Sequence, residues 1–208
     1  MAYSRGAYTV VYPVVRGTGP FFAVIGAGFV FGETYAAGQW LGVAVLMAGI
    51  FGLAGYNLRH VQVDRETLVP ALGLAVATGA FVALYTTYDA YGIRATADPF
   101  TFLAWFFLLD GLLFPLLMAR RLAGLGRAEV GPLAWRGALG AVVAWFSFGS
   151  IMLATRLDKV GEAAVLRETS TVFAALIGWL VLGEKVGAVR AGLMGLIAAG
   201  AVVMEMAG

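Results

Sequence analysis

The stretch DPFTFLAWFFLLDGLLFPLLMARR (residues 98–121) decides the class of fold. Between Asp98 and Arg120 a single ionisable residue, Asp110, interrupts a run dominated by leucine and phenylalanine. An α-helix needs roughly 20 apolar residues to cross the hydrocarbon core of a bilayer, and this run supplies them. The run is apolar on all sides, whereas a strand of a membrane β-barrel alternates apolar and polar residues. The stretch therefore predicts a membrane-spanning helix.

The composition extends this prediction to the whole chain. Of its 208 residues, 61% are hydrophobic and 12% are charged, whereas a soluble domain has about half and about a quarter. We therefore expect an all-α, polytopic bundle of about seven transmembrane helices in a cell membrane, specifically a bacterial inner membrane. The candidate spans are residues 18–32, 36–56, 67–88, 99–118, 137–155, 161–182 and 186–207.

Several classes of function are excluded by residue content. The chain has no cysteine and one histidine, His60, so neither a cysteine nor a histidine metal cluster is expected. No nucleophile–base arrangement stands out, and we expect neither an enzyme nor a cofactor. The net charge of +2 is spread over short basic clusters between apolar runs, and nucleic-acid binding requires a contiguous basic face. The expected partners are the lipid bilayer and a small solute, with a homo-oligomer left open.

An internal repeat connects the two ends of the sequence. The segment TGPFFAVIGAGFVFGE (18–33) aligns with TSTVFAALIGWLVLGE (169–184), and each copy continues into a second apolar helix. Just upstream, Arg16 falls on Arg167. The alignment predicts three parts, namely the end of a first copy (1–56), a linker (57–66) and a complete second copy of five helices (67–208). Counterparts of three second-copy helices would precede Met1, so we expect a late start codon, a fragment or a shortened protein.

These motifs resemble the EamA-type family of the drug/metabolite transporter superfamily. In that family an apolar helix closes with Leu-Gly-Glu and is followed by a short basic loop and a helix of small residues. The corresponding segments are VFAALIGWLVLGEKVGAVRAGLMGLIAAGAVVM (172–204) and YPVVRGTGPFFAVIGAGFVFGE (12–33). The resemblance implies ten helices in two inverted halves and export of amino acids, metabolites or drugs. A proline common in the family's fourth helix is Pro20 in the first copy and Thr171 in the second.

Charged and aromatic residues within spans are the candidate substrate-binding residues, because ionisable groups in a membrane usually face a cavity or a partner. Asp110 is interpreted either as a proton-coupling or ammonium site, or as a structural carboxylate. Arg167 and Glu168 are also candidates. Arg167 is interpreted as holding a substrate carboxylate, as pairing with Asp110 or Glu168, or as extending to the membrane interface. The aromatic candidates are Tyr85, Trp105 and Trp145, with contact to lipid as the alternative. Residues assigned to the structural motif of the repeat are Arg16, Pro20, Gly32, Glu33, Gly183 and Glu184.

Small residues recur every four positions in three expected helices, as Ala44-Ala48-Gly52, Ala71-Ala75-Gly79-Ala83 and Ala191-Gly195-Ala199. Such stripes are typical of close contacts between membrane helices. We therefore expect them to be contact faces of a transporter of small solutes. The alternative function is a non-transporting membrane component, or a truncated fragment that needs a partner or self-association.

Overall fold

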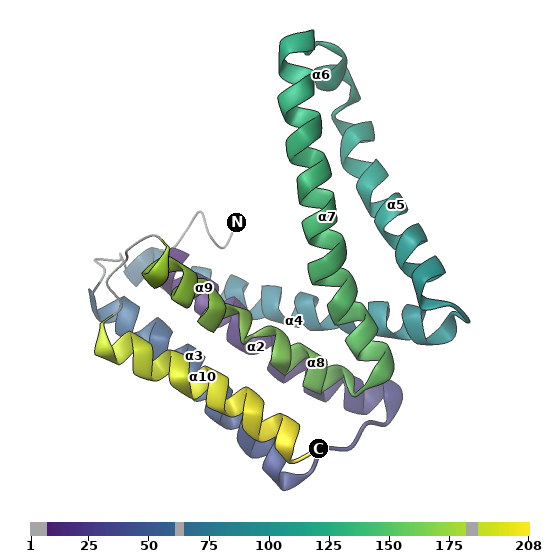
Figure 1. Cartoon of the computed structure of the whole chain (residues 1–208). Coiled ribbons are helices and arrows are strands. Elements are labelled where there is room, and N and C mark those ends of the chain that lie inside the picture. The colour runs from purple at the N-terminus through teal and green to yellow at the C-terminus, as the bar shows by residue number, and fades with distance from the viewer. Residues whose placement is uncertain (1–7, 61–64, 182–186) are drawn as a thin grey trace. The chain divides into compact units, whose positions relative to one another are not determined.

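The structure is a computed structural model that describes residues 8–60, 65–181 and 187–208. Over these residues the chain forms helices and no strand, which confirms the all-α fold class (Figure 1). In chain order the helices are α2 (Tyr8–Phe31), α3 (Ala37–His60), α4 (Arg65–Ala95), α5 (Pro99–Leu117), α6 (Ala119–Ala123), α7 (Arg127–Leu157), α8 (Val160–Arg167), α9 (Ser170–Leu180) and α10 (Ala188–Met206).

Within the described residues, six helices are long and apolar enough to cross a membrane. Their apolar segments are Val14–Phe31, Ala37–Arg59, Val69–Ala95, Pro99–Leu117, Ala128–Leu157 and Ala188–Met206. They correspond to six of the seven spans expected from the sequence. The chain is therefore a multi-pass membrane protein.

The seventh expected span, residues 161–182, is not one continuous helix. It is divided into α8, which ends at Arg167, and α9, which begins at Ser170. A charged residue, Glu168, occupies the division, and apolar periodicity alone did not reveal it.

The first span is longer than the sequence indicated. Proline usually interrupts a helix because it has no amide hydrogen and crowds the preceding turn, and the expected span, residues 18–32, did not include Pro13. Helix α2 instead begins at Tyr8 and runs through both Pro13 and Pro20. Membrane helices tolerate proline because neighbouring groups satisfy the freed carbonyls.

The chain divides into two compact units. One contains Met1–Tyr88 and Asp158–Gly208, and the other contains Asp89–Leu157. The boundary therefore lies within α4 and directly after α7. The first unit contains both copies of the repeat motif and is the one that matters for the candidate site.

In the first unit, α3 and α10 lie side by side (Figure 1). Their backbones approach closely at Gly42, where an added Cβ would lie 2.6 Å from the backbone nitrogen of Met204 and 2.7 Å from the carbonyl oxygen of Gly200. Leu46, Ile50 and Ile197 fill the core beside this crossing. Close approach through glycine is how membrane helices gain packing contacts without a hydrophobic driving force.

Only one of the three predicted small-residue stripes is a contact face. Ala71, Ala75, Gly79 and Ala83 are all buried, and Gly79 packs against Thr18 of α2. On the other two helices Ala44, Ala48, Ala191, Gly195 and Ala199 are exposed, and of these two stripes only Gly52 packs, against Leu193 of α10. In a chain rich in alanine and glycine, several faces of one helix carry small residues, so the spacing does not select the face that packs.

The second unit is held by aromatic packing between α5 and α7. Phe106 stacks on Phe148 with 5.8 Å between ring centroids, and Phe107 packs on Trp145 at 5.1 Å. The turn between α4 and α5 is bound by Arg156 of α7, which donates hydrogen bonds to the carbonyl oxygens of Ile93, Thr96 and Ala97. Asp98 caps the start of α5.

Candidate functional site

The division between α8 and α9 is a short stretch of tight, 3₁₀-type bonding. The amides of Glu168, Thr169 and Thr171 each donate to a carbonyl three residues earlier, at 3.0, 3.1 and 3.1 Å. The hydroxyls of Thr169 and Thr171 donate at 2.7 Å to the carbonyls of Leu166 and Glu168. These two hydroxyls therefore bond their own helix. A 3₁₀ stretch within a longer helix often marks a functional hinge.

Glu168 lies at this division with its side chain almost fully buried, at 1% exposure. The guanidinium of Arg16, from α2, forms an ion pair with it, with 2.9 Å between Arg16 Nε and Glu168 Oε2. Arg167 approaches the other carboxylate oxygen, with 3.6 Å between Arg167 Nε and Glu168 Oε1. Arg16 also donates from Nη2 to Ser170 Oγ at 2.6 Å. Two arginines, one from each copy of the repeat, therefore meet at one buried carboxylate.

The facing part of α2 contains a proline. Pro20 has no amide hydrogen and therefore cannot donate to the carbonyl of Arg16. Thr18 donates its hydroxyl to the carbonyl of Val14 at 2.8 Å. Gly19 leaves room beside Arg167, since a Cβ there would lie 4.0 Å from Arg167 Nη2. Because Pro20 aligns with Thr171, both copies of the repeat lose regular helical bonding at the same place.

The three charged groups of this cluster, Arg16, Arg167 and Glu168, sum to one positive charge. Buried charges are stabilised only by close partners, because removing them from water is costly. Glu168 supplies one negative charge to two guanidinium groups. Guanidinium groups bind carboxylates or phosphates through two parallel hydrogen bonds, so the two arginines are suited to contact an anionic group.

The other predicted substrate-binding residues lie elsewhere. Tyr85 lies on α4 and its side chain is 41% exposed. Asp110 and Trp105 lie on exposed positions of α5, and Trp145 packs on Phe107, all in the second unit. The pairing of Asp110 with Arg167 stays a prediction.

Of the repeat's structural-motif residues, Gly32 and Glu33 have defined geometry. Gly32 directly follows the last residue of α2 and has a φ of +66°, a conformation that residues with a side chain rarely adopt. Glu33 then accepts the backbone amide of Val160, the first residue of α8, at 2.9 and 3.2 Å from its two oxygens. Gly183 and Glu184, their counterparts in the second copy, lie outside the described residues.

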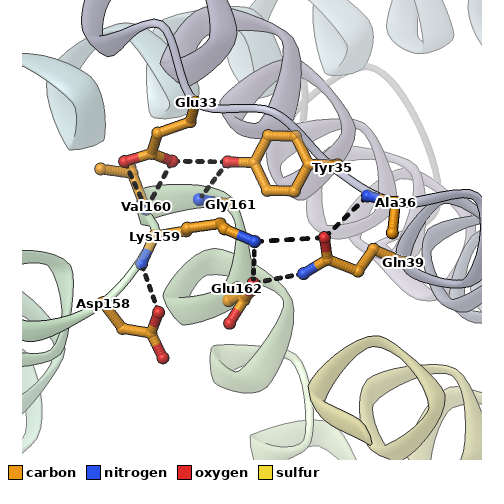
Figure 2. A network of polar contacts seen from close by, with 9 residues as sticks. All are labelled: Glu33, Tyr35, Ala36, Gln39, Asp158, Lys159, Val160, Gly161 and Glu162. Carbon is orange, nitrogen blue, oxygen red and sulfur yellow. Dashed lines mark hydrogen bonds and ion pairs between the residues drawn. The ribbon is translucent and has the colours of Figure 1, made fainter. Parts of the chain in front are cut away.

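Sequence reasoning missed a second polar cluster, formed by Tyr35, Gln39, Lys159 and Glu162 around Glu33 (Figure 2). A signal for it existed, because Gln39 and Glu162 are polar residues within expected apolar spans. Both are buried, at 1% and 5% exposure. No group of histidine, cysteine, aspartate and glutamate residues suited to a metal ion occurs in the part of the chain that the structure describes.

Comparison with known proteins gives one match. Residues 69–206 match the EamA-like transporter family. No curated protein and no solved structure matches the chain. The matched range covers more than half of the chain and contains α8, Arg167 and Glu168.

Proposed function

The chain belongs to the EamA-like transporter family, and from this membership we propose that it carries a small solute across the membrane through a site formed by Arg16, Arg167 and Glu168. The buried cluster of two arginines around one glutamate is the observation that supports this assignment most directly. Ionisable groups inside a membrane protein are costly, so their presence in a family of transporters favours a role in solute binding.

The position of Glu168 along its helix supports a site near the middle of the membrane. Glu168 follows Val160, the first residue of α8, by eight positions, which corresponds to about 12 Å of helix. The hydrocarbon core is about 30 Å thick. Transporters commonly bind their solutes near the midplane, beside helices that are interrupted.

The charge of the cluster supports a solute that carries a carboxylate or a similar anionic group. Such a group would offer Arg167 a bidentate partner in place of its 3.6 Å contact with Glu168. Amino acids and other metabolites with a carboxylate satisfy this requirement. A solute with only positive charge does not.

We propose that Tyr85, Trp105, Trp145 and Asp110 are further residues that the solute contacts along its route. The repeat supports two inverted copies, in residues 1–56 and 67–208, joined by the linker 57–66. We also propose that the protein lies in a bacterial inner membrane and that it forms a homo-oligomer.

The decisive experiment is solute exchange in liposomes that contain the purified chain. The liposomes are loaded with an unlabelled solute, and the entry of the same solute in labelled form is measured. The solutes are pyruvate, which carries a carboxylate, L-phenylalanine, which carries a carboxylate and an ammonium group, and putrescine, which carries only ammonium groups. We expect exchange of a carboxylate-bearing solute and none of putrescine. Exchange of putrescine alone would exclude the anion site, and no exchange of any solute across a wide panel would contradict transport.

The site is tested with the variants Arg16→Gln, Arg167→Gln and Asp110→Asn. Arg190→Gln is the matched control, because Arg190 lies exposed on α10 and its Nη2 bonds to Asn57 Oδ1 at 3.2 Å, away from the cluster. We expect the exchange rate to fall at least tenfold in the first two variants and to stay within twofold in the control. Unchanged exchange in both arginine variants, with the protein folded, would show that the cluster is not the site.

A further inference from the structure

The second polar cluster ties three helix ends together (Figure 2). Tyr35 donates its hydroxyl to Glu33 Oε2 at 2.6 Å and accepts the amide of Gly161 at 3.1 Å. Glu33 accepts the amide of Val160. The loop after α2 therefore holds both of the first two amides of α8. We call Glu33 and Tyr35, with the Val160 and Gly161 amides, the latch.

The start of α3 reinforces the latch. Gln39 accepts the amide of Ala36 at 2.9 Å and donates to the carboxylate of Glu162. Lys159 contacts Gln39 Oε1 and Glu162 Oε1, each at 3.2 Å. Its Nζ also lies 5.5 Å from the centre of the Tyr35 ring. These contacts fix the first turn of α8 against the ends of α2 and α3.

The bonds of the latch are suited to breaking and re-forming. Burial and the neighbouring Glu33 carboxylate raise the pKa of Tyr35, so its hydroxyl stays protonated and can donate. Hydrogen bonds to a charged group such as the Glu33 carboxylate contribute a net stabilisation of about 1.5–3 kcal/mol each, because water replaces them when they break. A carboxylate at a helix N-terminus also gains from the partial positive charge there. The hydrogen bonds of the latch therefore have defined partners and can still break and re-form.

Helix α8 itself has the construction of a small rigid lever. It runs from Val160 to Arg167 and then meets the tight 3₁₀ stretch at Glu168 and Thr169. Its buried apolar residues are Val160, Gly161, Ala163, Ala164 and Val165, none of them larger than valine. A movement of α8 therefore gives up less apolar contact than a movement of a helix with large side chains would.

We propose that α8 is a gate on one side of the membrane, closed in this structure by the latch and hinged at Glu168–Thr169. This inference rests on the proposed transport function, because a gate has meaning only for a solute path. Arg167 is the last residue of α8 and Glu168 follows it, so the hinge coincides with the charged cluster. A solute that rearranges the contacts of Arg167 and Glu168 would change the angle between α8 and α9. This change would strain the hydrogen bonds of the latch at the other end of α8.

The absence of cysteine from the sequence makes a direct test possible. Ala164→Cys places a thiol on α8 at a position that is 1% exposed and packs on Ala23 and Ala83. Its rate of modification by a charged, membrane-impermeant methanethiosulfonate reagent is measured in liposomes. The rate is compared between the parent latch and the latch variants Glu33→Gln and Tyr35→Phe. The readout needs no transported solute, so its outcome is separate from that of the exchange experiment.

We expect both latch variants to raise the modification rate of the Ala164 reporter at least fivefold. Glu205→Gln, which alters an exposed carboxylate in the last turn of α10, is the matched control and should leave the rate unchanged. A second reporter, Ala75→Cys, lies in the buried contact around Val14 and Ala71 and should remain unreactive. Equal rates with and without the latch would overturn the proposal, as would an equal rise at the Ala75 reporter, which would indicate general unfolding.

Discussion

Arg16 and Glu168 form a buried ion pair across the two copies of the repeat, with 2.9 Å between Arg16 Nε and Glu168 Oε2. Arg167, the residue that aligns with Arg16, approaches the same carboxylate. The position that aligns with Glu168 is Gly17, where an added Cβ would lie 2.9 Å from Ile50 Cγ2. The first copy therefore has no room for a second carboxylate, and one glutamate serves both arginines.

Replacing Glu168 with glutamine should destabilise the protein. Glutamine keeps the shape of the side chain but leaves Arg16 and Arg167 without their counter-charge. Removing one partner of a buried ion pair costs about 3–5 kcal/mol, and we expect the melting temperature in detergent to fall by roughly 10 °C. The control is Glu205→Gln, at an exposed position of α10, which should change the melting temperature little.

A triple variant separates the stability of the cluster from its function. With Arg16, Arg167 and Glu168 all replaced by methionine, the three charges of the cluster are removed together, and such replacements are often neutral or stabilising. We expect the melting temperature to return to that of the parent chain while solute exchange is lost. A triple variant that still exchanges solute would remove the cluster from the transport mechanism.

The crossing of α3 and α10 should be sensitive to side-chain size at Gly42. A leucine there would meet the backbone of Met204 and Gly200, at distances of 2.6 and 2.7 Å from its Cβ. Overpacking costs about 1–3 kcal/mol when side chains can adjust, and a clash with backbone belongs at the upper end of that range. Gly55→Leu, on the same helix with nothing within 4 Å of the added Cβ, is the control. Equal melting temperatures for the two variants would contradict the packing.

The sequence predicted the fold class and the membrane spans because apolar length depends only on composition along the chain. It also aligned Arg16 with Arg167, the residues that meet at Glu168. It could not predict the division at Glu168, since residues 161–182 read as one apolar run and apolar length does not indicate a change from α-helical to 3₁₀ bonding. The contact of Glu33 with Val160 was equally out of reach, because it joins residues far apart in the sequence. The stripes on α3 and α10 were predicted wrongly because which helix face packs depends on a partner helix that is distant in the sequence.

The cap of α5 should give the second unit a pH-dependent contribution to stability. Hydrogen bonds from the hydroxyl and amide of Thr101 hold the pKa of Asp98 below its usual value. The ionised cap therefore stabilises the fold at pH values above the usual aspartate pKa of about 3.9. This contribution is lost as the pH falls through the lowered pKa of the folded state. The melting temperatures of the parent and of Asp98→Ala should differ at pH 6 and converge towards pH 3, whereas a constant difference would contradict the assignment.

Gly32 should tolerate side chains only to the extent that they accept a positive φ. Its φ is +66°, and an added Cβ would have nothing within 4 Å, so any cost arises from the backbone alone. The left-handed conformation costs alanine about 1–2 kcal/mol, and asparagine adopts it more readily. We expect Gly32→Ala to lower the melting temperature and Gly32→Asn to lower it less. Gly55→Ala should raise it, because Gly55 lies inside α3 in open space, where alanine favours a helix by about 1 kcal/mol over glycine. The two alanine variants thus have opposite expected signs, and a shared sign would show that Gly32 does not determine the end of α2.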